Sequence, residues 1–211
     1  MKKIMMTLAA VAVAATMNAQ GYVGGTINFS SDKSNNGTVG TAATQETTQT
    51  GFGIAPEFGY KLDDKMAVGI ALGFGFTNTK KENVGAAANV PNPSDFKTTT
   101  ISIKPYLRYQ VLTFGKANVF VDGGLDFTSI KATDYKAAMN FGLFVTPGIS
   151  FDVNEKWSIV AKLDDMFTLG YSKNAVPDLD GAPDASSNLN FGLSTGGFQL
   201  GSLRFGVYYN F

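Results

Sequence analysis

Residues 66–77 read MAVGIALGFGFT, and the alternation in this stretch decides the fold. Large apolar side chains occupy every second position: Met66, Val68, Ile70, Leu72, Phe74 and Phe76. Glycine, alanine and one threonine fill the positions between them. Because successive side chains of a strand point to opposite faces, a repeat of two predicts a β-strand with one bulky apolar face and one small or polar face.

The same alternation recurs along the chain. It is strong in residues 51–60, 101–110, 139–151 and 202–211, and weaker in residues 22–30, 118–128 and 157–169. Together with residues 66–77 these stretches give eight candidate strands, an even number.

The connections between the candidate strands also alternate. Short polar turns are expected at residues 61–65, 112–117 and 152–156, an intermediate connection at 131–137, and long loops at 31–50, 80–97 and 170–197. Short turns at one end and longer loops at the other are typical of a transmembrane antiparallel up-and-down β-barrel. The predicted fold class is therefore all-β, with eight strands in a single barrel.

Composition decides which face of each strand lies inside. Charged residues make up only 16% of the chain, whereas soluble domains average about 25%. A soluble barrel with its bulky face inside would expose mostly glycine, alanine and threonine. Such a surface has too few charged residues for a soluble protein. With the bulky face outside, the large side chains meet lipid and the small ones fit a narrow interior. Strands that span lipid must close into a barrel, because an open edge leaves backbone groups unpaired.

The first segment has the pattern of an export signal. Lys2 and Lys3 precede the apolar run 4–15, and Ala19 is the small residue expected before a signal-peptidase cut. We expect a cleaved signal peptide at residues 1–19 and a barrel domain at residues 20–211; the alternative is a short anchoring helix. Removing Lys2 and Lys3 leaves 15 basic residues against 17 acidic ones, a net charge of −2. This charge gives no basis for nucleic-acid binding.

Prolines and aromatic residues mark the strand ends. Pro56, Pro105 and Pro147 each stand four residues before an aromatic residue that adjoins a short turn. Because proline has no N–H to donate, we expect bulges or broken pairing near all three. Aromatic residues near the strand ends predict two interfacial girdles: Tyr60, Tyr109, Phe151, Trp157, Phe167, Tyr171, Tyr209 and Phe211.

The chain ends with apolar or aromatic residues at alternate positions: Leu203, Phe205, Val207, Tyr209 and Phe211. With the signal peptide and the alternating strands, this ending resembles the small porin-like outer-membrane β-barrel family, of the OmpA/OmpX type. The resemblance implies a lipid-embedded barrel in the cell outer membrane with both mature termini in the periplasm. It also implies that periplasmic chaperones escort the chain, and that the five terminal residues are its signal to the barrel-assembly machinery.

Two stretches depart from the plain pattern. Leu189, Phe191 and Leu193 alternate like a strand, yet Gly196 and Gly197 follow and interrupt them. Asp165 would face lipid in the plain register, so we expect the seventh strand to slip or end early there.

Eight charged residues fall on the inward face of the predicted barrel. They are the acids Glu57, Asp122, Asp126 and Asp164 and the bases Lys104, Arg108, Lys162 and Arg204. Buried charges must be paired to be tolerable, so these residues predict an internal salt-bridge network that fills the lumen. Its densest part is expected where Lys104 and Arg108 meet Asp122 and Asp126 across a hairpin. The alternative is a gated ion path.

The chain contains no histidine and no cysteine, which removes the usual general base, imidazole metal ligands and thiolate chemistry. We therefore predict no enzymatic activity, no catalytic or metal site and no cofactor. The favoured function is a non-enzymatic outer-membrane barrel that serves envelope integrity, surface contact or loop-mediated binding of an unidentified extracellular ligand. The alternative is a narrow, low-conductance channel for ions or very small solutes.

Overall fold

The computed structural model describes residues 20–38, 43–85, 95–177, 185–193 and 203–211. The expected signal peptide, residues 1–19, lies outside these ranges. No helix in the described ranges is long and apolar enough to cross a membrane.

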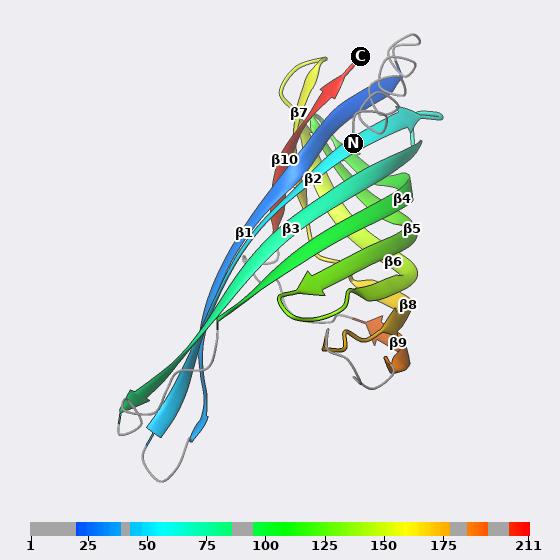
Figure 1. Cartoon of the computed structure of the whole chain (residues 1–211). Helices are drawn as coiled ribbons and strands as arrows, with labels where there is room; N and C mark the ends of the chain where they lie inside the picture. The colour runs from blue at the N-terminus through cyan, green and yellow to red at the C-terminus, as the bar shows by residue number, and fades with distance from the viewer. Residues whose placement is uncertain (1–19, 39–42, 86–94, 178–184, 194–202) are drawn as a thin grey trace, which may run out of the picture.

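The described residues form ten antiparallel strands (Figure 1): β1 (Gly21–Thr38), β2 (Ala43–Lys61), β3 (Met66–Gly85), β4 (Phe96–Phe114), β5 (Ala117–Ala132), β6 (Ala138–Asp152), β7 (Trp157–Lys162), β8 (Phe167–Lys173), β9 (Ser187–Leu193) and β10 (Arg204–Asn210). Each strand from β1 to β5 pairs with the next, and β5 pairs with β6. β7 and β8 both pair with β6 and share the seventh position. β10 beside β7 and β9 beside β8 share the eighth position.

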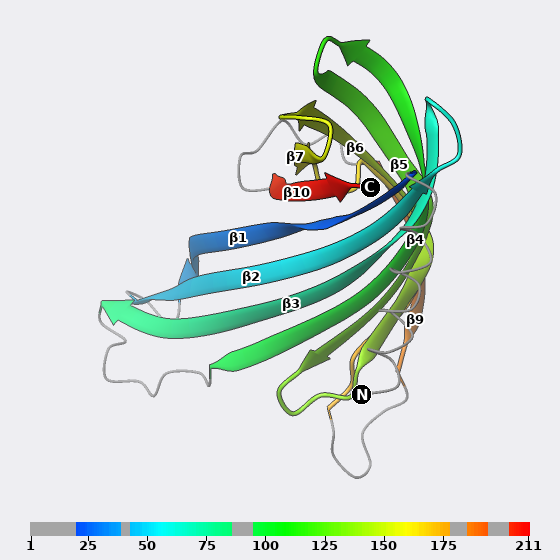
Figure 2. The same ribbon diagram turned by 90° about the horizontal axis from the view of Figure 1, so that it is seen from above.

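Pairing of β10 with β1 closes the sheet. The result is a closed eight-stranded antiparallel barrel, as the sequence predicted. Figure 2, seen from above, shows the strands curving around a central space.

The bulky face of each strand points outward. Ile103, Phe141 and Phe205 are about half exposed, at 45%, 48% and 53%, whereas the inward Phe120 and Tyr208 are 2% and 3% exposed. A contiguous apolar surface of this extent is stable only against a lipid or protein partner. The predicted facing is confirmed, with large side chains outside and mostly small or polar ones inside.

Two of the predicted long loops contain strand. Residues 31–38 and 43–50 continue the β1–β2 hairpin, with Ser31 opposite Thr50 and Lys33 opposite Thr48. Residues 80–85 extend β3 beside β2. We name residues 30–38, 43–50 and 77–85 the polar arm; in Figure 1 it is a twisted ribbon at the lower left. These segments are polar on both faces, so they lack the hydrophobic alternation that would have revealed them.

The third predicted long loop, residues 170–197, also contains strand. β8 continues to Lys173, and the strand-like stretch with Leu189 and Phe191 forms β9, paired along β8. The rings of Phe167 and Phe191 pack edge to face, with centroids 5.6 Å apart. Gly196 and Gly197 lie outside the described residues.

Each proline of the predicted repeat interrupts one ladder, as expected. The β2–β3 pairing stops at Ile54 and resumes at Glu57, which leaves Pro56 unpaired on that side. Pro105 leaves the same kind of gap between β4 and β5. Both prolines keep their partner on the other neighbouring strand, so only the side that would need the missing N–H is broken.

At Pro147 the interruption is wider. Four residues, 163–166, lie opposite the two β6 residues Thr146 and Pro147, and they separate β7 from β8. The seventh strand therefore ends early at Lys162, as predicted. Because these four residues leave the extended conformation, side-chain direction no longer alternates there. Asp165, which the plain register places against lipid, instead bonds to the inward Lys104.

Candidate functional site: the charged lumen

Four aromatic rings cross the lumen, and each lies directly opposite a glycine on a neighbouring strand. The pairs are Tyr22 with Gly59, Tyr106 with Gly69, Phe120 with Gly148 and Tyr208 with Gly24. A Cβ atom on any of these glycines would lie 2.0–2.5 Å from a ring atom. Only a residue without a side chain leaves room for the ring, so the glycines fix where the rings lie. We name Tyr22, Tyr106, Phe120 and Tyr208 the ring layer.

The ring layer surrounds a buried guanidinium group. Arg108 donates from Nε to Asp122 Oδ1 at 2.7 Å and from Nη2 to Asp122 Oδ2 at 2.9 Å. The guanidinium carbon lies 3.9 Å from the centre of the Phe120 ring, and Nη2 also donates to the Tyr208 hydroxyl at 3.1 Å. Arg108 is thus held by a two-pronged ion pair and a stacked ring, the strongest arrangement open to a buried arginine.

Lys162 and Glu57 complete this part of the network. Lys162 Nζ lies 2.8 Å from both carboxylate oxygens of Glu57 and 2.9 Å from Asp122 Oδ2. The hydroxyls of Tyr106 and Tyr208 donate to Glu57 Oε2 at 3.1 and 2.9 Å. We name Glu57, Arg108, Asp122 and Lys162 the turn-end cluster, because it lies nearer the short turns. Its two acids and two bases cancel, and both acids are 1% exposed.

A second group, the loop-end cluster, consists of Lys104, Asp126 and Asp165. Lys104 Nζ lies 3.1 Å from Asp126 Oδ2 and 2.8 Å from Asp165 Oδ2. Thr146 donates its hydroxyl proton to Asp165 Oδ1 at 2.5 Å. One base faces two acids, so this cluster carries a net charge of −1.

The remaining predicted pair is more exposed. Arg204 Nη2 lies 2.7 Å from Asp164 Oδ1, with side chains 34% and 55% exposed. The structure thus places all eight predicted residues in ion pairs and joins Arg108 to Asp122 and Lys104 to Asp126. These four residues do not form one densest group, because Arg108 and Asp122 join Glu57 and Lys162, whereas Lys104 and Asp126 join Asp165. The inward placement of Asp165 and the ring layer were not predicted from the sequence. A large ring on the inward face opposite a glycine is a signal that could have revealed the ring layer, once the register was known.

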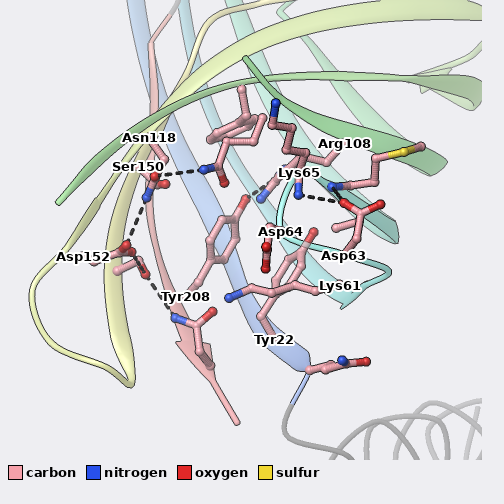
Figure 3. A pocket seen from close by; sticks show the side chains of 17 residues that line it. Tyr22, Lys61, Asp63, Asp64, Lys65, Arg108, Asn118, Ser150, Asp152 and Tyr208 are labelled. Carbon is pink, nitrogen blue, oxygen red and sulfur yellow. Dashed lines mark hydrogen bonds between the residues drawn. The ribbon is translucent and has the colours of Figure 1, made fainter. Parts of the chain in front are cut away.

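Two cavities lie on opposite sides of these side chains. One, of about 390 Å³, opens at the turn end and is floored by Arg108, Tyr22 and Tyr208 (Figure 3). The other, of about 60 Å³, lies between the two clusters and is lined by residues that include Lys162 and Lys104. They have no lining residue in common. The ring layer and the turn-end cluster lie between these two cavities.

The family described as "Outer membrane protein beta-barrel domain" matches residues 4–211. The chain belongs to this family. As an outer-membrane β-barrel, it lies in the cell outer membrane with lipid against its apolar face.

Solved structures of other outer-membrane barrels are similar to this one. The outer membrane protein OprG from Pseudomonas aeruginosa is 16% identical, with 91% of this chain and 96% of that chain covered and a TM-score of 0.48. The Neisserial surface protein A is 14% identical, with 92% and 98% covered and a TM-score of 0.43. The Escherichia coli outer membrane protein W is 16% identical, with 93% and 100% covered and a TM-score of 0.39. No curated protein sequence matched the chain.

Part of the wall of the turn-end cavity of this outer-membrane barrel is a chain of hydrogen-bonded polar side chains (Figure 3). Gln110 donates to Asn118, and Asn118 donates to Asp152 at 3.0 Å. Asp152 also accepts from Ser158 at 2.7 Å, and Ser158 accepts from Asn210. These side chains satisfy one another's hydrogen-bonding groups, so this part of the wall is polar and needs no bound ligand as a hydrogen-bond partner. Within the described part of the chain, no three acidic, histidine or cysteine side chains are placed to hold a metal ion.

The predicted assembly residues form the outer face of the last strand. Phe205 and Val207 are about half exposed, and Leu203 precedes β10. The ring of Tyr209 packs against Trp157 and Phe211, with centroids 5.1 and 5.2 Å away. All three rings belong to the set of aromatic residues predicted to form the two interfacial girdles.

Proposed function

We propose that this protein is a non-enzymatic outer-membrane barrel with a plugged lumen, and that it acts through its surface and its polar arm rather than by conducting solutes. The observation that carries the proposal is the ring layer with the turn-end cluster, which spans the interior between the two cavities. Outer-membrane barrels of this family are generally non-enzymatic. Envelope integrity, surface contact and loop-mediated binding of an extracellular ligand all fit a barrel of this kind.

The free-energy cost of separating buried ion pairs supports a lumen that stays closed. Opening a path would separate Arg108 from Asp122 or Lys162 from Glu57. Leaving either member of a buried pair uncompensated costs about 3–5 kcal/mol unless water replaces the partner. The stacked Phe120 ring and the tyrosine hydroxyls add to this barrier.

The proposal includes the path by which the barrel reaches the membrane. Residues 1–19 act as a cleaved signal peptide, and periplasmic chaperones carry the chain to the barrel-assembly machinery. That machinery recognises the strand ending in Tyr209 and Phe211. Both mature termini then lie in the periplasm, and the polar arm lies on the extracellular side. The short turns near the termini support this orientation.

The second candidate is a narrow channel for ions or very small solutes. The observation that favours it is the pair of polar cavities, which only one layer of side chains separates. Movement of that layer would join the cavities, and the unbalanced acid of the loop-end cluster would favour cations.

Planar-bilayer conductance of the purified barrel separates the two candidates. We expect the parent barrel to show no steady current, and Phe120→Ala to introduce current by removing the ring beside Arg108. The Tyr208→Phe variant, which keeps its ring and loses only a hydroxyl, serves as the matched control and should stay closed. Steady conductance of the parent, with Arg108→Ala fully stable, would establish a hydrated lumen and favour the channel.

A further inference from the structure

Three lysines form a row on the outward face of the barrel at the loop end. They are Lys97 on β4, Lys131 at the end of β5 and Lys173 at the end of β8. The register fixes their direction: Lys131 lies opposite Thr99, two residues from the outward Ile101, and Lys173 lies opposite the outward Met139. All three side chains are exposed.

The row lies just beyond the apolar band. Lys131 is four residues past Phe127, and Lys173 is two residues past Tyr171. At about 3.3 Å per residue along tilted strands, the Cα atoms of Lys173 and Lys131 lie about 5–10 Å farther along the barrel axis than those of Tyr171 and Phe127. Lysine stems commonly follow an apolar surface while the ammonium group stays in the polar region above it.

Among the described residues, no acidic side chain neutralises the row. No carboxylate in the described ranges forms an ion pair with Lys97, Lys131 or Lys173. The acids nearest in sequence, Asp95 and Asp134, lie farther along the chain from the apolar band.

The turn end of the barrel has a different outward face. Outward positions there carry Tyr109, Phe151 and Trp157, which are 47–49% exposed. Aromatic rings suit a neutral interface, whereas a row of unpaired lysines suits an anionic one.

We propose that Lys97, Lys131 and Lys173 bind phosphate-bearing lipid headgroups in the membrane leaflet at the loop end. The apolar band that these lysines continue already contacts the acyl chains, so one lipid can occupy both surfaces. Lys97 and Lys131 lie on adjacent strands, about 4.8 Å apart, and Lys173 lies beyond β6, about 10 Å across the sheet from β5. With their long stems, the three ammonium groups can share the phosphates of one or two headgroups. Each lysine should contribute about a fivefold gain in affinity for an anionic lipid.

The test uses the mature barrel in nanodiscs that contain phosphatidylcholine and phosphatidylglycerol, with bound lipid measured by native mass spectrometry. We expect the parent to retain phosphatidylglycerol preferentially. The variant Lys97→Gln, Lys131→Gln, Lys173→Gln should lose this preference, and Lys131→Gln alone should lose about fivefold. Equal retention by the parent and the triple variant would overturn the proposal. The single variant keeps the test decisive if the triple variant does not fold.

A matched control removes three lysines at the other end: Lys65→Gln, Lys116→Gln, Lys156→Gln. It should retain phosphatidylglycerol as the parent does; an equal loss would show that net charge, rather than the row, attracts the lipid, and would contradict the proposal. Inorganic phosphate distinguishes a free-anion site from a lipid site. Full displacement of the lipid by inorganic phosphate at the same concentration would also overturn the lipid assignment.

Discussion

The ring of Phe120 lies directly opposite Gly148 across the β5–β6 pair, and a Cβ on Gly148 would come within 2.4 Å of the Phe120 Cζ atom. The same ring also contacts a charged group, because the guanidinium carbon of Arg108 lies 3.9 Å from the ring centre. Gly148 therefore helps to position Arg108 indirectly, through the ring of Phe120.

Gly148→Ala should force the Phe120 ring to move and should destabilise the barrel by about 1–3 kcal/mol, the usual cost of overpacking. Gly123→Ala is the matched control on the neighbouring strand, where a Cβ would meet only one backbone oxygen at 3.8 Å; we expect a change within about 0.5 kcal/mol. Urea unfolding in lipid vesicles, followed by the fluorescence of Trp157, measures both. Equal stabilities of the two variants would contradict the packing argument.

Arg108→Ala should lower stability by about 3–5 kcal/mol, because Asp122 then shares Lys162 with Glu57 and the turn-end cluster carries an uncompensated charge. Adding Asp122→Ala restores neutrality, so the double variant should recover part of the loss. Thermal unfolding of the two variants tests this coupling. Lys33→Ala, which breaks the exposed pair with Glu46, is the control and should cost about 1 kcal/mol or less.

Asp164 and Asp165 are adjacent but differ in surroundings, which makes them a matched pair. Asp165→Ala removes a partly buried partner of Lys104 and of Thr146, and should cost about 1–3 kcal/mol. Asp164→Ala breaks only an exposed pair with Arg204 and should cost under about 1 kcal/mol. If the two variants unfold at the same urea concentration, the inward placement of Asp165 is wrong.

Val145→Arg tests the lipid-facing side. Near the bilayer midplane an outward arginine should cost about 2–4 kcal/mol, whereas Ser129→Arg, near the loop-end interface, should cost about 0–1 kcal/mol. Folding yields and unfolding free energies in vesicles give both values. An arginine tolerated equally at the two positions would refute the assigned depth.

Deletion of Phe211 should lower the amount of barrel in the outer membrane without changing export across the inner membrane. The basis is the terminal aromatic residue, which also packs on Tyr209. Cell fractionation with immunoblotting measures both steps, and Phe211→Tyr is the control that keeps an aromatic end. Unchanged outer-membrane levels after the deletion would remove the assembly role.

Periodicity predicted the strands that have one face in lipid and one in the lumen, such as residues 66–77. It missed the polar arm because a strand with water on both faces needs no hydrophobic alternation. Residues 46–50 and 77–79 are rich in threonine, which suits strands, but propensity alone is a weak signal without burial. The predicted loops there were wrong for this reason.

The lumen charges were found because inward positions follow from the same alternation, and cross-strand pairing then brings Arg108 to Asp122. The sequence predicted the wrong face for Asp165, because the direction of this side chain depends on the two extra residues opposite Pro147. These extra residues appear only when β6, β7 and β8 are considered together. The ring layer was not predicted because it depends on which residues of two neighbouring strands lie opposite each other. The Tyr22 ring has room only because Gly59 lies opposite it, and neither segment alone specifies this register.

The polar arm differs from a flexible loop in the free energy that a ligand would spend on ordering it. β1 runs nine residues beyond the exposed Phe29 to reach Thr38, about 30 Å at 3.3 Å per residue. Hydrogen-bonded pairing with β2, and of β2 with β3, holds this length as a sheet. A molecule that binds the arm therefore meets a preformed surface and does not spend binding free energy on ordering a flexible chain.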